Sequence, residues 1–201
     1  MRIRGLVALK HRHPGVWKAV EAVNAFLFCV RKRNLPEVAA KVLSAASGAE
    51  YRYSFVEAGD IPGLEAFLKS QPKEYLSYFS PHPFDAETLS RLFRNRAFLM
   101  MKVTAVEGDG ESLAGYFFLR CFFVGKAFAG LVVDEPRQNR GIGSTIWRIC
   151  AEICEGTGLK MQATISENNI PSVRSCRKAT DMTVVDRFEN NYMAITCEKK
   201  D

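Results

Sequence analysis

The stretch Leu131-Val-Val-Asp-Glu-Pro-Arg-Gln-Asn-Arg-Gly-Ile-Gly-Ser-Thr-Ile146 decides the fold prediction for this sequence. It begins as a buried strand, continues as a loop, and ends in glycines that open a helix. The first turn of a helix offers free backbone N–H groups and the positive end of the helix dipole, and both favour an anion. The glycines let a phosphate approach the backbone, and Arg137 and Arg140 add positive charge. The stretch therefore predicts a site for a phosphate-bearing ligand.

Two well-known phosphate-binding patterns do not match this stretch. A Walker loop requires Gly-Lys-Ser/Thr, which is absent from the stretch. A Rossmann fingerprint requires a third glycine at the position that Ile146 occupies. The identity of the site therefore depends on the elements around it.

Hydrophobic periodicity in the flanking sequence predicts a mixed α/β domain. Three strands with glycine-containing turns precede the stretch, and a helix, a strand, a short helix and a hairpin follow it. The expected strands cover 51–57, 98–106, 113–124, 127–133, 159–165, 183–188 and 192–197. The expected helices cover 60–70, about 85–93, 141–157 and 171–179, with an aromatic loop over 71–84. The order of elements from residue 51 is β-α-α-β-β-β-α-β-α-β-β.

The run Gln138-Asn139-Arg140-Gly141-Ile142-Gly143 has the form Gln/Arg-x-x-Gly-x-Gly, with a strand before it and a helix after it. A further short helix opens at Asn169-Ile-Pro-Ser172. In this motif and in the order of its elements, the chain from 51 to 199 resembles the GNAT acetyltransferase superfamily. The resemblance implies an α/β fold with a mixed, largely antiparallel seven-stranded sheet flanked by helices.

The resemblance also implies acetyl-CoA as co-substrate. Backbone amides of 138–144 would hold its pyrophosphate, and the edge of the strand at 131–133 would pair with its pantetheine amides. A main-chain N–H of that strand would polarise the thioester carbonyl, and the residues at the start of the later short helix would contact the cofactor arm. The cofactor-binding residues expected on this basis are Leu131, Val132, Val133, Gln138, Asn139, Arg140, Gly141, Ile142, Gly143, Ser144, Asn169 and Ser172.

The catalytic residues follow less directly from the resemblance. Many family members carry a tyrosine seven residues after the asparagine, placed to protonate the leaving CoA thiolate, and this chain has Cys176 there. A thiol with a pKa of about 8.5 is protonated at neutral pH and could act as the acid, although a packed core cysteine is the competing interpretation. Tyr192 is another candidate acid. The sequence does not assign a general base, and the candidates are Glu57, His82, Asp134, Glu135 and Glu167.

Charge divides the chain near residue 50. Residues 1–50 hold 9 Lys/Arg and 3 Asp/Glu, whereas 51–201 hold 19 of each, so the whole net charge of +6 lies in the first quarter. This predicts a basic helical extension over 1–49 and a GNAT-like domain over 50–201, with no nucleic acid expected as partner.

The extension carries an apolar stripe at helical spacing. Its members are Val16, Val20, Val23, Leu27 and Val30. We expect this face to pack on the domain or in a homodimer, and peripheral contact with an anionic membrane is the less favoured alternative.

Neither a metal site nor a membrane span is expected. The six cysteines form no Cys-x-x-Cys pair, and Cys150 and Cys154, four residues apart, indicate core packing rather than metal binding. No apolar run approaches the roughly 18 residues of a membrane span. Arg31-Lys-Arg33 follows the apolar segment where a signal sequence would have its cleavage site, so a cytoplasmic protein is predicted.

The predicted function is transfer of an acetyl group from acetyl-CoA to a primary amine of a small molecule, by direct attack in a ternary complex. A catalytically silent acyl-CoA-binding module and a protein-amine acetyltransferase are the alternatives.

In the superfamily the acceptor approaches over the segment that is 62–96 here. This segment is slightly basic, and the residues at its centre are aromatic: Tyr75, Tyr78, Phe79, His82 and Phe84. Such a wall favours a small acceptor amine that is neutral or carries an anionic group.

Overall fold

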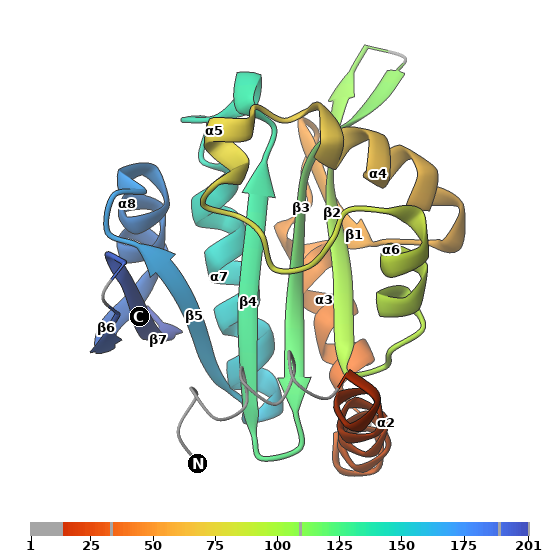
Figure 1. Ribbon diagram of the computed structural model, residues 1–201. Coiled ribbons are helices and arrows are strands. Elements are labelled where there is room, and N and C mark those ends of the chain that lie inside the picture. The colour runs from red at the N-terminus through yellow and green to blue at the C-terminus, as the bar shows by residue number, and fades with distance from the viewer. Residues whose placement is uncertain (1–13, 33, 109, 189, 201) are drawn as a thin grey trace.

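The computed structural model describes residues 14–32, 34–108, 110–188 and 190–200, with side chains described from residue 21 onward except Cys29. The described residues form a mixed seven-stranded sheet with helices on both faces (Figure 1). The strands are β1 (Tyr51–Phe55), β2 (Phe98–Glu107), β3 (Gly110–Phe122), β4 (Lys126–Val133), β5 (Lys160–Ser166), β6 (Thr180–Arg187) and β7 (Tyr192–Lys199). The helices are α2 (Pro14–Arg31), α3 (Leu35–Ala46), α4 (Ile61–Ser70), α5 (Lys73–Leu76), α6 (Ala86–Phe93), α7 (Ile142–Thr157) and α8 (Ile170–Ala179).

The sheet has the order β1-β2-β3-β4-β5-β7-β6. Every neighbouring pair is antiparallel except β4 and β5, which run parallel. The crossover between these two strands is α7, as a strand-helix-strand unit requires. The predicted fold class, a largely antiparallel seven-stranded sheet, is confirmed.

The parallel pair separates after a short contact. β4 and β5 pair only where Lys126–Phe128 meets Lys160–Gln162. Beyond this point β4 continues to Val133 along β3, and β5 continues to Ser166 along β7. The facing edges of β4 and β5 are therefore not paired with each other over the second half of both strands. This gap positions the candidate site.

Two hydrophobic cores hold the layers together. On one face of the sheet, α3 and α7 cover the larger core, which includes the fully buried Phe117 and Trp147. On the other face, α4 and α6 cover a smaller core around Leu64, Leu89 and Tyr116. The apolar stripe predicted for α7 is buried throughout, because it faces the sheet. Its members are Ile142, Ile146, Ile149, Cys150, Ile153 and Cys154.

The structure corrects three details of the sequence interpretation. The segment expected to be an aromatic loop contains α5, a helix of four residues. β6 begins at Thr180, three residues earlier than predicted, directly after α8 ends. The apolar stripe of the first helix was expected to be buried, but its members Val23, Leu27 and Val30 are exposed. Among the described side chains of α2, the buried one is Phe28. Val16 and Val20 lie outside the described side chains.

The second helix of the basic extension shares the larger core. Leu35, Ala39 and Leu43 of α3 are buried against α7 and β1. A division of the chain at residue 49 stays a prediction. Among the described residues, no helix is long and apolar enough to cross a membrane.

Candidate active site

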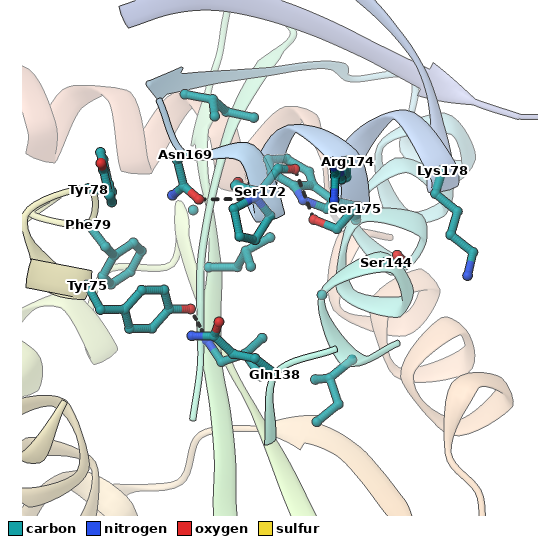
Figure 2. Close-up of a pocket in the computed structure, with 18 of the residues that line it drawn as sticks. Tyr75, Tyr78, Phe79, Gln138, Ser144, Asn169, Ser172, Arg174, Ser175 and Lys178 are labelled. Atoms are coloured by element: carbon teal, nitrogen blue, oxygen red, sulfur yellow. Dashed lines mark hydrogen bonds between the residues drawn. The ribbon is translucent and has the colours of Figure 1, made fainter. Parts of the chain in front are cut away.

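A cavity of about 320 Å³ occupies the gap between β4 and β5. α7, α8 and the segment around α5 complete its walls (Figure 2). The wall thus combines strand edges, the starts of two helices and an aromatic side. An elongated ligand that needs backbone hydrogen bonds and a phosphate site would find both here.

The glycine turn at the start of α7 forms one end of the cavity. Asn139 and Gly141 have positive φ angles, 61° and 85°, which only residues such as Gly and Asn adopt readily. Gly141 precedes the first turn of α7, and no side chain caps it. The N–H groups of that turn therefore remain available for an anion. The phosphate cradle at this turn stays a prediction.

A hydroxyl from α5 lies at the open edge of β4. The Val133 N–H donates to Tyr75 Oη at 3.2 Å, so this N–H points away from β3 and into the gap (Figure 2). Burial raises the pKa of Tyr75, which therefore stays protonated at neutral pH. The sequence predicted the β4 edge as a binding surface, but not that a tyrosine hydroxyl would contact it.

The start of α8 forms the opposite wall. Asn169 is the N-cap of this helix, and its side-chain oxygen accepts from the Ser172 N–H at 3.2 Å. The cap uses only the side-chain oxygen of Asn169, so the N–H groups of its side-chain amide are not needed for it. The Asn-Ile-Pro-Ser motif thus has a structural role in starting α8, in addition to placing both polar side chains at the cavity.

Most of the predicted cofactor-binding residues come together in the cavity wall. They are Leu131, Val133, Gln138, Asn139, Gly141, Ile142, Gly143, Ser144, Asn169 and Ser172. Val132 and Arg140 are not among the lining residues. Val132 is fully buried on the other face of the sheet, as the alternation of a strand requires, and Arg140 is exposed.

The basic residues that give the cavity its positive charge differ from those that the sequence predicted. Arg137 donates to Asp134 Oδ2 at 2.5 Å and to Glu107 Oε1 at 2.7 Å, so its charge is already balanced. Arg137 lines the cavity, and so do Arg174 and Lys178 of α8, which Figure 2 labels. The sequence reasoning missed these two residues, although their spacing of four places them on one face of a helix.

The candidate catalytic residues lie outside the cavity wall. Cys176 is fully buried, with its Sγ 3.5 Å from both Cys197 Sγ and Thr180 Oγ1. Tyr192 donates its hydroxyl to the Ser77 carbonyl at 3.3 Å. This placement favours packing over proton transfer for Cys176.

The candidate bases are also engaged elsewhere or lie away from the wall. Asp134 pairs with Arg137, Glu167 pairs with Arg187, and Glu57 forms a capping box with Asp60. His82 packs in the aromatic cluster beside Tyr116, 3.3 Å from its hydroxyl. Among the described residues that line the cavity there is no Asp, Glu or His.

Comparison with known proteins agrees with this geometry. A model of the acetyltransferase (GNAT) family matches residues 64–179, which is more than half of the chain. The chain belongs to the GNAT acetyltransferase family. The match begins in α4 and ends in α8, so it contains the gap between β4 and β5 and the glycine turn. No curated protein sequence matches this GNAT chain significantly.

Solved structures share the GNAT fold at low sequence identity. A domain from Methanocaldococcus jannaschii is 17% identical, with a TM-score of 0.62 over 74% of this chain and 98% of its own. Spermidine N-acetyltransferase from Vibrio cholerae, in complex with CoA and spermine, is 14% identical, with a TM-score of 0.57 over 75% and 94%. AAC(6')-Ib, in complex with paromomycin and acetyl-CoA, is 11% identical, with a TM-score of 0.57 over 75% and 94%.

Proposed function

We propose that this GNAT protein transfers an acetyl group from acetyl-CoA to the primary amine of a small molecule, by direct attack within a ternary complex. The observation that carries the proposal is the gap between β4 and β5, which ends at an uncapped helix N-terminus. The complexes of two structural neighbours with CoA or acetyl-CoA support acetyl-CoA as the co-substrate.

The chemistry of the cavity fits acetyl-CoA. The glycine turn offers N–H donors for the pyrophosphate, and the edge of β4 offers backbone groups for the amides of the pantetheine arm. Arg174 and Lys178 add two positive charges on α8. Trp147 lines the cavity, and its indole N–H is buried without a hydrogen-bond partner among the described residues. A buried donor of this kind costs about 1–3 kcal/mol unless a ligand accepts from it.

In the proposed reaction, acetyl-CoA supplies the activated acetyl thioester when bound. The edge of β4 orients it, and a main-chain N–H of that edge polarises the thioester carbonyl. Tyr75, Tyr78 and Phe79 form the aromatic side of the cavity and hold the acceptor against that edge. The acceptor amine must arrive without its extra proton, because an ammonium has no lone pair for attack.

The first prediction concerns this proton. With no carboxylate or imidazole among the described cavity-lining residues, we propose that the amine loses its proton to solvent. The value of kcat/KM should then rise about tenfold per pH unit below the pKa of the amine itself. Two acceptors with different amine pKa values should level off at different pH values. A break near neutral pH that is the same for both acceptors would instead reveal a side-chain base.

The second prediction concerns Tyr75. If the pantetheine arm accepts from the Val133 N–H, then Tyr75 Oη must release it on binding. Tyr75→Phe should therefore tighten CoA binding by about two- to tenfold, since a neutral hydrogen bond contributes about 0.5–1.5 kcal/mol. Calorimetric titration with CoA measures this, with Tyr78→Phe as the matched control that should bind like the wild type. Weaker binding by the Tyr75 variant would mean that its hydroxyl contacts the ligand.

The third prediction concerns the cysteine that replaces the family's tyrosine. Because the Cys176 thiol faces Cys197 and Thr180, Cys176→Ala should keep kcat within about threefold of the wild type. Cys197→Ala removes the neighbouring thiol and serves as the control for packing. A loss of about a hundredfold or more in kcat for Cys176→Ala alone would establish it as the general acid.

The charge of the cavity also narrows the acceptor class. The described wall carries Arg137, Arg174 and Lys178 but no acidic side chain, so a polyamine or a lysine-rich peptide would meet no countercharge in the wall itself. We therefore propose a small acceptor that is neutral or anionic apart from its amine. Steady-state assays against small amines, amino acid derivatives, amino sugar nucleotides, polyamines and lysine-rich peptides test this. Turnover of peptides or polyamines alone would overturn it.

A further inference from the structure

The end of the sheet opposite the glycine turn carries an exposed apolar surface. α2 lies beside the β3–β4 hairpin at this end (Figure 1). We call it the α2 surface, and it consists of Val23, Phe26, Leu27 and Val30 of α2 with Phe123 and Val124 of the hairpin. Phe26 is 70% exposed, Val124 60% and Val23 58%. Isolated exposed apolar residues are ordinary, but a group of six on two adjoining elements indicates a contact surface.

The α2 surface is held in place by polar contacts behind it. Asn24 donates to the Cys121 carbonyl and accepts from the Phe123 N–H, each at 3.0 Å. Glu21 accepts from Arg120 at 2.6 Å, and Phe28 is buried in the larger core. These contacts fix the inner side of α2 on the domain. Its apolar stripe consequently faces outward rather than into the core.

Basic side chains border this surface. Glu21, Ala22, Ala25 and Phe26 line a shallow cavity with the turn that joins α6 to β2. Helix α6 contributes Arg91 and the turn contributes Arg94 and Arg96, all three exposed, and Arg31 is exposed at the end of α2. The one carboxylate lining the cavity among the described residues is Glu21, which is already paired with Arg120 and lies 3.8 Å from Arg91. The surface is therefore apolar in its middle and positive at its border.

We propose that the α2 surface binds the surface of an anionic lipid membrane, with α2 lying along the bilayer plane. A helix that presents apolar side chains outward beside arginines has the pattern of an interfacial helix. The apolar residues lie along one helix and at the tip of a hairpin, and each is exposed enough to contact the acyl region below the headgroups. A second copy of the chain fits less well, because a symmetric contact would bring the same arginines together.

The experiment is flotation of the full-length protein with vesicles at physiological ionic strength. Binding is expected to vesicles that contain phosphatidylglycerol and not to vesicles of phosphatidylcholine alone. Phe26→Asp should weaken binding by roughly tenfold or more, because it removes an inserting side chain and adds a negative charge. Val185→Asp is the matched control. Val185 is 53% exposed on β6, and its variant should bind like the wild type.

A second variant tests the charged border independently. Arg94→Gln combined with Arg96→Gln should weaken binding by about fivefold for each charge removed. Circular dichroism and thermal melting verify that each variant is folded. Failure of the wild type to bind anionic vesicles would overturn the proposal, as would equal binding by the Phe26 and Val185 variants. A dimeric native mass that Phe26→Asp converts to a monomer, without vesicle binding, would assign the surface to a second copy instead.

Discussion

Replacing Gly141 by Asp is expected to weaken CoA binding at least tenfold, the equivalent of about 1.4 kcal/mol. Gly141 stands immediately before α7 with a φ of 85°, and its missing side chain leaves open space at the cavity. An aspartate would place a carboxylate where the proposed pyrophosphate lies, at the positive end of the helix. Calorimetric titration of the variant and the wild type with CoA measures the loss.

The matched control is Gly141→Asn. Asn and Asp have nearly the same size, and both tolerate a positive φ better than other side chains. The asparagine variant should therefore bind CoA more tightly than the aspartate variant, and the difference should shrink as salt screens the charge. Equal affinities of wild type and Gly141→Asp, in a folded protein, would mean that the glycine turn does not hold the pyrophosphate.

The second large effect is expected at Gly130, in the middle of β4. A Cβ there would lie 2.4 Å from Cζ of Phe118, much closer than atoms can approach. Phe118 has little freedom to move, since its ring stacks on Phe98 with centroids 4.8 Å apart and lies 6.3 Å from Phe79. Gly130→Ala should therefore lower the free energy of unfolding by about 1–3 kcal/mol. Denaturant unfolding measures this directly.

Two further variants identify the cause of that loss. Phe118→Leu in the Gly130→Ala background shortens the clashing side chain and should recover part of the stability, giving a favourable coupling energy. Gly63→Ala makes the same change inside α4, where nothing lies within 4 Å, and should stabilise by up to about 1 kcal/mol. A Gly130→Ala variant as stable as the wild type would show that the sheet relaxes around the new methyl group.

The sequence predicted the parts of the molecule that depend on local pattern. The apolar stripe of α7, the glycine turn at 141–143 and the cap at Asn169 follow from helical spacing and from the side chains that start helices. The antiparallel meander β2-β3-β4 also follows, because short glycine turns produce hairpins, and α7 produces the parallel pair of β4 with β5.

The sequence could not predict contacts between distant residues. Arg137 belongs to the glycine-turn region, yet its charge is balanced by Glu107, 30 residues earlier. Tyr75 reaches Val133 from a helix of four residues, which is too short to produce a periodic pattern. Such pairings depend on how the elements pack, and no local signal in the sequence records them.

The first helix shows a different limit of sequence reasoning. Its stripe correctly indicated a helix with an apolar face, and α2 is that helix. The pattern does not say what covers the face, and burial was the expected answer. The structure leaves Val23, Leu27 and Val30 exposed, because Asn24 and Phe28 anchor the opposite side of α2 to the hairpin and the core.

Thiol release from acetyl-CoA tests the central claim most directly. The purified protein is incubated with acetyl-CoA and a panel of small amines, free CoA thiol is measured with a thiol reagent, and each amine is examined by mass spectrometry. We expect at least one small amine to gain an acetyl group in a one-to-one ratio with the thiol released, and little release without amine. Tight binding of acetyl-CoA with no amine acetylated would contradict the account and identify a silent acyl-CoA-binding module.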